Sequence, residues 1–484
     1  MFLDLWTLLV DGANDSVRWI WVFLTTHFVT LLGFAMGLLV MGQLIRERRQ
    51  TSNIFAWFLL IVFMPFVGAI LYFLFGGTKS RFVLKNKSRV RNYAAAIAEK
   101  GHSDIAPDPA RPFEFQRMEG NSFELLPDNV TCFEALCREI ENAEKSIHVM
   151  TYILGNDEAG RRVVDLLAKR ASEGIEVKLL IDAVGSMGRG GRFVDPIRKA
   201  GGRAVRFMPV IPFHTKTSAN LRNHRKMAIF DRKRLITGGQ NIDTRFMGPT
   251  PDPDVFKDFS ALIEGPIVSQ FNRHFVSDWC FTTGDKPETF KEQLLFRPDN
   301  VGDAVMRAVP SGPDMERDTL WERLIIQIQE CKEELTVVTP YFLPDSVIMA
   351  SLAVKAHMGK KITLILPEHS NQKMVDRARY HHLRELKEEG INILFYQPGM
   401  VHAKLFIADR KIAMIGSANM DMRSLFVNFE IGLFIQDPEV IVQLQNWADS
   451  LVPDCVPFHR SKKARATPGR IFLEDIAHLM MPLL

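Results

Sequence analysis

The chain has 484 residues, of which 47% are hydrophobic and 24% are charged, and its formal net charge at pH 7 is +4. So small a positive charge argues against a protein whose main partner is nucleic acid. The five cysteines form no Cys-x-x-Cys pair, which argues against a zinc site or a disulfide scaffold and suits reduced thiols in the cytoplasm.

Two long uncharged stretches lie in the first 75 residues. Trp19–Ile45 and Ile54–Phe75 have 27 and 22 residues without a charge, and roughly 20 apolar residues suffice to cross the hydrocarbon core of a bilayer. The short link Arg46–Arg49 separates them. The pattern predicts a two-helix membrane hairpin with spans at about 19–45 and 54–75, too long for a cleaved signal peptide. Its expected interfacial anchors are Trp19, Trp21 and Tyr72.

A basic segment follows the second stretch and completes a predicted membrane region over residues 1–90. Because the flank richer in Lys and Arg stays in the cytoplasm, we expect the rest of the chain on the cytoplasmic side. The arginines of the link argue mildly against this orientation. A hairpin that does not fully cross the bilayer would be compatible with both groups of cations. The same cations would attract anionic lipid head groups, at about 1 kcal/mol each. The six cations are Lys79, Arg81, Lys85, Lys87, Arg89 and Arg91.

Beyond this region, two similar series of strands and helices predict an α/β fold built from two pseudo-symmetric halves, 110–290 and 291–484. Alternating strands and helices imply a mostly parallel sheet covered by helices in each half, and the fold class that we expect is mixed sheets flanked by helices. The first series is a strand at 146–152, a helix at 160–174 and a strand at 175–182. The second is a strand at 335–341, a helix that ends near Ala356 and a strand at 361–367.

Each half carries one copy of the pattern His-x-Lys-x4-Asp-x6-Gly-[Gly/Ser]-x-Asn. With 13 histidines and 60 lysines and arginines, one His-x-Lys triplet is expected by chance, but two copies of the longer pattern are not. The first copy comprises His224, Lys226, Asp231, Gly238, Gly239 and Asn241. The second comprises His402, Lys404, Asp409, Gly416, Ser417 and Asn419.

The repeated pattern suits a phosphate group. Residues i and i+2 of a strand share a face, so the His and Lys of each copy lie together. The ammonium neutralises phosphate oxygens, while the imidazole attacks phosphorus or moves a proton. The later Asn can donate an amide hydrogen bond to the same anion. We assign Asp231 and Asp409 to the catalytic set. Alternatively, each aspartate orients the lysine of its copy or the turn that is expected after the apolar run.

The doubled pattern resembles the phospholipase D superfamily, in which both copies build one active site. The resemblance implies a covalent phospho-histidine intermediate, no metal and no cofactor. It makes His224 the nucleophile and His402 the acid and then the base, although the order could be reversed. A Glu at the position of Glu430 is expected to hold a catalytic histidine, and Asp258 is its counterpart in the first half. Ser417, opposite Gly239, makes the two copies unequal.

The sequence also resembles bacterial cardiolipin synthases in two shorter segments, the pattern Pro65-x-x-Gly68-x-x-x-Tyr72-x-x-x-Gly76 and the closing Pro482-Leu483-Leu484. This implies a phosphatidyltransferase of the bacterial inner membrane that converts two phosphatidylglycerol molecules into cardiolipin and glycerol. The alternatives are a hydrolytic phospholipase D, a synthase that takes phosphatidylethanolamine as donor, and, less favoured, a nuclease. The tail 471–484 is expected to form a short amphipathic helix, at a membrane interface or docked on the core.

Overall fold

The computed structural model describes residues 15–46, 51–64, 67–68, 71–72, 81–100, 116–187, 192–209, 220–461 and 467–479. The chain divides into two compact units, Met1–Gly77 with Leu479–Leu484, and Thr78–His478. Several segments singled out in the sequence lie outside the described residues: most of the hairpin link, the end of the second stretch, Lys79 and the Pro-Leu-Leu end. The side chains of Trp19 and Trp21 also lie outside them.

In the first unit, two helices form where the sequence predicts a hairpin. They are α2 (Asp15–Arg46) and α3 (Thr51–Phe63). Close packing joins them, since a Cβ added to Gly37 would lie 3.1 Å from Val62 of α3. The helix α3 ends short of the predicted span because the sequence places Pro65 just beyond it. Among the described residues, no helix is both long enough and apolar enough to cross a membrane.

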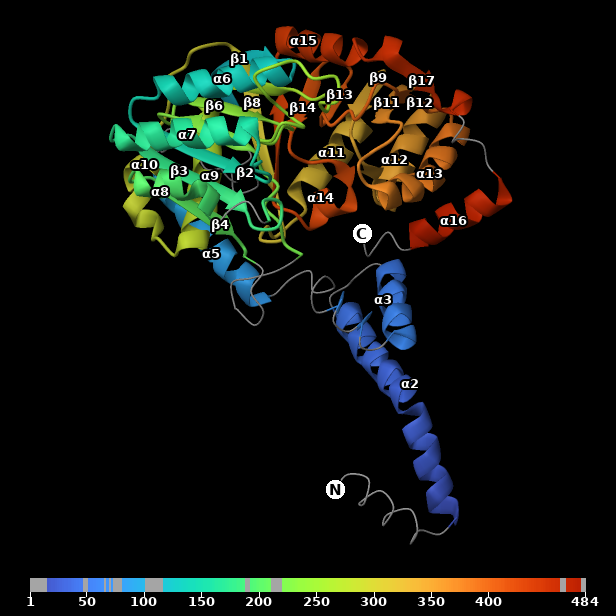
Figure 1. Ribbon diagram of the computed structural model, residues 1–484. Coiled ribbons are helices and arrows are strands. Elements are labelled where there is room, and N and C mark those ends of the chain that lie inside the picture. The colour runs from blue at the N-terminus through green and yellow to red at the C-terminus, as the bar shows by residue number, and fades with distance from the viewer. Residues whose placement is uncertain are drawn as a thin grey trace, which may run out of the picture. The chain divides into compact units, whose positions relative to one another are not determined.

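In the second unit, fifteen of the described strands form one mixed sheet (Figure 1). The first half contributes, in spatial order, β1 (Met118–Leu126), β7 (Ser260–Glu264), β6 (Arg234–Gly238), β5 (Met227–Phe230), β2 (Ser146–Thr151), β3 (Glu176–Asp182) and β4 (Arg203–Phe207). The second contributes β8 (Ala304–Ser311), β16 (Glu430–Ile435), β14 (Ile412–Gly416), β13 (Leu405–Ala408), β9 (Glu334–Val338), β11 (Lys361–Pro367), β12 (Asn392–Tyr396) and β17 (Cys455–Pro457). The orders match strand for strand up to β17, and β1 pairs with β8 at the centre. The two halves are therefore pseudo-symmetric.

The expected mixed sheets are confirmed, whereas the mostly parallel sheet implied by the alternation of strands and helices alone is wrong. Strands β2, β3 and β4 are parallel, as are β9, β11 and β12. However, β5, β6 and β7 pair antiparallel, and so do β13, β14 and β16. The reason is local. The strands β5 and β13, which follow the two His-x-Lys pairs, each turn straight back through a tight hairpin, and such a hairpin can only join antiparallel neighbours.

Helices cover both faces of each half, and one core joins the halves. In β5, Ala228 and Phe230 pack in the cluster under the first-half helices, whereas Met227 and Ile229 belong to a core that also contains Leu405 of β13. The first-half helices are α6 (Asn129–Asn142), α7 (Glu158–Ser172), α8 (Asp195–Lys199), α9 (Ile267–Thr283) and α10 (Lys291–Leu295). The others are α5 (Arg81–Lys100), α11 (Thr319–Glu330), α12 (Ser346–His357), α13 (Lys373–Glu388), α14 (Met422–Phe426) and α15 (Pro438–Asp449).

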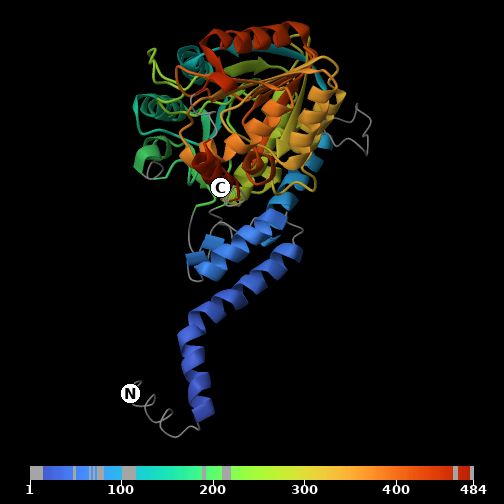
Figure 2. The same cartoon turned by 90° about the vertical axis from the view of Figure 1, so that its right-hand side faces the viewer.

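Helix α15 ties the second half to the first. It packs on both β14 and β1 and is the red helix at the top of Figure 2. The indole Nε1 of Trp447 donates to the carbonyl oxygen of Pro127 at 2.9 Å. Trp447 also meets the ring of Phe259 at 4.6 Å. These contacts make Thr78–His478 one compact unit rather than two separable halves.

The C-terminal helix α16 (Pro468–Leu479) docks on α13 through its acidic side chains. Asp475 lies 3.2 Å from His381, and Glu474 pairs with Arg384. Its apolar Phe472 and Leu473 stay exposed. The tail is therefore a helix held on the core by charge, with an apolar side facing outward.

Candidate active site

The two His-x-Lys segments are each held by the backbone of the opposite half. The N–H of His224 donates to the carbonyl oxygen of Phe429 at 2.9 Å, and the N–H of His402 donates to that of Lys257 at 2.8 Å. These bonds lie next to Glu430 and Asp258 in the sequence. The crossing therefore brings each histidine beside a carboxylate from the other half.

The carboxylates bind the histidine rings directly. Nδ1 of His224 lies 2.9 Å from Oε1 of Glu430, and Nδ1 of His402 lies 2.8 Å from Oδ2 of Asp258. Both carboxylates are buried. A carboxylate on Nδ1 fixes the tautomer and leaves Nε2 for a reacting group. The sequence pattern alone did not show that the pairs cross between the halves.

Both lysines fold back toward the histidine of their own copy. Nζ of Lys226 donates to the carbonyl oxygen of His224 at 2.7 Å, and Nζ of Lys404 lies 3.0 Å from Nε2 of His402. Burial lowers the pKa of Lys226 to about 7 and that of Lys404 to about 8. An anion placed between them would restore both charges, so the pair forms a cradle suited to a phosphate.

The two histidine–carboxylate pairs differ in their proton affinity. Burial raises the pKa of Asp258 to about 6, although the nearby Lys404 opposes this. Burial also acts on Glu430, but His224 and Lys226 outweigh it and hold the pKa of this carboxyl below its ordinary value. Burial lowers the pKa of His224 to about 4 and that of His402 still more clearly below its usual range. Both rings are therefore neutral near pH 7 in the free protein, and only Glu430 is firmly ionised.

The Gly239 and Ser417 positions explain part of this asymmetry. A Cβ at Gly239 would lie 2.6 Å from both carboxylate oxygens of Asp258, so only glycine leaves room for that carboxylate. In the second half, Oγ of Ser417 accepts from the N–H of Ile431 at 3.0 Å and lowers the pKa of Glu430 by hydrogen bonding. The two copies therefore hold their carboxylates by different means.

The two asparagines lie in the site but are bonded differently. Oδ1 of Asn241 accepts from the backbone N–H of Ile153 at 3.1 Å, which leaves its NH2 group to serve another acceptor. Oδ1 of Asn419 is buried and has no hydrogen-bond partner among the described residues. The Asn241 amide can therefore donate to a bound anion, whereas the Asn419 side chain already hydrogen-bonds Asp421 and has one further N–H to offer.

Aromatic rings flank both histidines, and the sequence reasoning missed them. The ring of Tyr152 meets that of His224 edge-on at 4.8 Å. The rings of Phe246 and Phe256 lie 4.9 Å and 6.0 Å from that of His402. The only signal for Tyr152 was its place at the end of a predicted strand. These rings keep the imidazoles in an apolar setting, which is the cause of their low pKa.

The family follows from comparison of the sequence with known families. The profile of the family described as "Cardiolipin synthase, PLD-like domain" matches residues 136–279 and 324–452, which is more than half of the chain and contains both histidines. The chain belongs to this family. A second profile, described as "Phospholipase_D-nuclease N-terminal", matches residues 37–77.

Individual relatives agree with this assignment. A cardiolipin synthase of Oceanobacillus iheyensis is 29% identical over 95% of this chain and 99% of its own. One from Listeria welshimeri is 30% identical over 90% of this chain and 95% of its own. The solved phosphatidylserine synthase of Haemophilus influenzae covers 80% of this chain and 100% of its own, at a TM-score of 0.60 and 13% identity, and supports the fold alone.

In this member of the cardiolipin synthase family, Asp231 and Asp409 do not lie with the histidines. They follow the far ends of β5 and β13, which places each about 20 Å of extended chain from its histidine. Asp231 accepts backbone N–H bonds from residues 144–146 at 2.6–2.9 Å, and Asp409 accepts them from 332–334 at 2.7–3.1 Å. Their φ values, 52° and 53°, belong to the hairpin turn. The geometry therefore favours the turn-forming alternative over the catalytic role.

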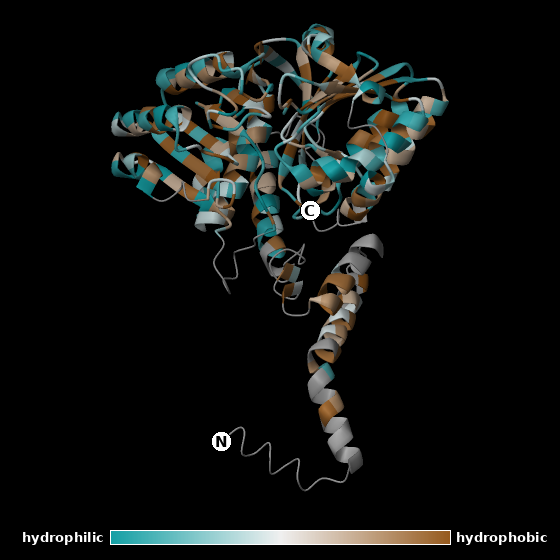
Figure 3. Ribbon diagram, turned by 45° about the vertical axis from the view of Figure 1, so that its right-hand side comes forward, coloured by the Kyte–Doolittle hydropathy of each residue, from teal (hydrophilic) through white to brown (hydrophobic). Residues whose placement is uncertain are grey.

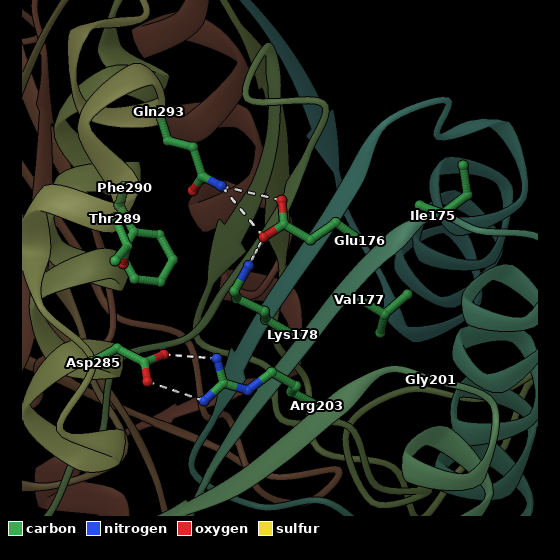
Figure 4. A pocket seen from close by; sticks show the side chains of 10 residues that line it. All are labelled: Ile175, Glu176, Val177, Lys178, Gly201, Arg203, Asp285, Thr289, Phe290 and Gln293. Carbon is green, nitrogen blue, oxygen red and sulfur yellow. Dashed lines mark hydrogen bonds and ion pairs between the residues drawn. The ribbon is translucent and has the colours of Figure 1, made fainter.

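A pocket of about 470 Å³ lies beside β3 and β4 (Figure 4). Its charges are paired with one another: Arg203 bonds Asp285 at 2.7 Å, and Lys178 bonds Glu176. No residue of either copy of the His-x-Lys pattern lines it. The pocket therefore offers no unpaired cation to a phosphate group.

Proposed function

We propose that this chain is a cardiolipin synthase that transfers a phosphatidyl group between two phosphatidylglycerol molecules. The observation that carries this proposal is the pair of histidines, each bonded through Nδ1 to a carboxylate of the opposite half, in a chain that belongs to the cardiolipin synthase family. Two imidazole rings, each oriented by a carboxylate, would supply both a nucleophile and a proton carrier to one phosphate.

In the proposed reaction, Nε2 of His224 attacks phosphorus of the first phosphatidylglycerol. The bond from phosphorus to the glycerol oxygen breaks, and His402 donates the proton that this oxygen takes up. The neutral His402 then removes the proton from a terminal hydroxyl of the second phosphatidylglycerol. That oxygen attacks phosphorus and releases His224, so the products are cardiolipin and glycerol. Lys226, Lys404 and the amides of Asn241 and Asn419 neutralise or bind the phosphoryl oxygens.

The difference between the two carboxylates supports this order of events. Glu430 stays ionised and keeps the proton of His224 on Nδ1, so Nε2 is free to attack. Asp258, with its pKa raised to about 6, belongs to the pair that more readily holds a proton. Entry of an anionic phosphate raises the proton affinity of that pair further and charges His402 as the acid.

We also propose that the hairpin anchors the enzyme in the bilayer that contains its substrates. The match over residues 37–77 supports this, as do the apolar side chains left exposed on the first unit, among them Phe23, Phe28, Leu39 and Phe63. In Figure 3, much of the described part of α2 and α3 has the colour of hydrophobic residues. A lipid environment would cover such side chains. Anchoring raises the local concentration of lipid hydroxyls relative to water, which favours transfer over hydrolysis. The inner membrane and a cytoplasmic site are part of this proposal.

The direct test uses full-length protein in mixed micelles with phosphatidylglycerol labelled in its head-group glycerol and in an acyl chain. We expect cardiolipin and free glycerol in equal amounts. Phosphatidic acid in place of cardiolipin would instead identify a hydrolytic phospholipase D. Added phosphatidylethanolamine tests the other donor, because its use would release ethanolamine.

The pKa values predict a bell-shaped dependence of kcat/KM on pH. Activity should fall below about pH 6, where Asp258 becomes neutral and releases its hold on His402. It should fall again above about pH 7 to 8, where Lys226 and Lys404 lose their charge. The upper limb of kcat should lie at higher pH, because bound phosphate raises the pKa of both lysines. In Lys226→Arg the guanidinium stays charged, so an upper limb unchanged by this substitution would contradict the assignment to Lys226.

A further inference from the structure

The helix that follows the hairpin in sequence, α5, sends a lysine into the interior of the second unit. The side chain of Lys87 is 1% exposed and forms ion pairs with Asp278 of α9 at 2.6 Å and with Asp314 at 3.0 Å. Arg91 is also buried, whereas Lys85 and Arg89 are exposed. Two of the six cations expected to attract lipid head groups are therefore turned toward the protein.

Lys87 belongs to a buried network that reaches the residues around His224. Asp278, which binds Lys87 with one oxygen, uses the other to accept from Arg225 at 2.7 Å and from Nδ2 of Asn223 at 2.9 Å. Arg225 and Asn223 are the neighbours of His224 on either side. Lys87 is thus linked to residues 223–225, the catalytic segment around His224, through the carboxylate of Asp278.

A second connection reaches the carboxylate partner of His224. Nζ of Lys87 lies 4.3 Å from the centre of the Phe429 ring, a cation–π contact. Phe429 precedes Glu430 and accepts the backbone N–H of His224 at 2.9 Å. Nε of Arg225 donates to the carbonyl oxygen of Glu430 at 3.0 Å. Both members of the His224–Glu430 pair are therefore supported by the same cluster.

We propose that Lys87 is a positioning residue that aligns His224 with Glu430, so that α5 is a working part of the active site and not only a connection to the hairpin. This rests on the proposed role of His224 as nucleophile. The lysine does not touch the reacting atoms. It fixes Asp278 and Phe429, which lie on two sides of the catalytic segment and come from elements far apart in the sequence.

The test is Lys87→Met in the full-length protein, which keeps an unbranched side chain, one heavy atom shorter, and removes the charge. We expect kcat to fall on the order of 10- to 100-fold, because a misplacement of a reacting group by about 1 Å costs about that much. KM for phosphatidylglycerol should stay unchanged, since the lysine is buried away from the lipid. In single-turnover experiments, formation of the phospho-histidine should slow by the same factor.

A matched control is Lys85→Met, which removes an exposed cation from the same helix. Its kcat should stay within about twofold of the original, and any weaker attraction to anionic lipid should appear in KM. A loss of kcat as large as that of Lys87→Met would overturn the proposal.

A second variant separates positioning from simple neutralisation of buried charge. Lys87→Met combined with Asp314→Asn removes a cation and an anion together, so the thermal midpoint should recover. The kcat deficit should remain, because Asp278 and Phe429 still lack the ammonium. If kcat recovers together with the thermal midpoint in the double variant, the proposal that Lys87 is a positioning residue is overturned. An undiminished kcat in Lys87→Met alone would overturn it as well. Neither result depends on the proposed function, which fails only if the unsubstituted protein makes no cardiolipin.

Discussion

Replacement of His224 by alanine is expected to abolish cardiolipin formation, with a loss of at least about 10³-fold in kcat, because no other group can form the covalent intermediate. His402→Ala should cause a similar loss, since its ring serves both proton transfers. The measurement is cardiolipin and glycerol release in mixed micelles, with folding of each variant checked by its thermal midpoint. Full activity of either variant would refute the two-histidine mechanism.

An activated donor distinguishes the roles of the two rings. A phosphatidyl ester whose leaving group is stable as an anion needs no acid to depart. With this donor, His402→Ala should still release the leaving group once and accumulate a phosphorylated His224, because the second proton transfer is blocked. His224→Ala should release nothing. The reverse pattern would make His402 the nucleophile.

The sequence predicted the parts of the site whose information is local. The members of each His-x-Lys pair are only two residues apart, directly before the short strand β5 or β13, and the two-residue period of extended chain placed them on one side. The doubled series of strands and helices likewise predicted two halves, and the sheet has matching strand orders around β1 and β8. The alternation of strands and helices did not predict that β5 and β13 pair antiparallel with β2 and β9, because such a series indicates only the parallel part of each sheet.

The parts that could not be predicted depend on contacts between distant residues. The crossing of His224 to Glu430 and of His402 to Asp258 arises because each motif segment bonds to the backbone of the other half, and no spacing within the chain encodes that. The burial of Lys87 has the same origin. A run of cations reads as a solvated face in sequence, and only its packing against Asp278 and Asp314 turns one of them inward.

Glu430→Gln is expected to lower kcat by about 10³-fold or more while the fold is retained, because glutamine has nearly the same shape and no charge. The glutamine amide can donate to Nδ1 of His224, which would move the ring proton to Nε2 and block its attack. With the activated donor, formation of the phospho-histidine should therefore be slow in Glu430→Gln. The matched variant Asp258→Asn should leave that step nearly intact and impair the transfer to the second lipid, because His402 is the base only then. If phospho-histidine formation slows equally in both variants, the division of labour between the two halves is contradicted. If it does not slow in Glu430→Gln, the carboxylate does not set the tautomer of His224.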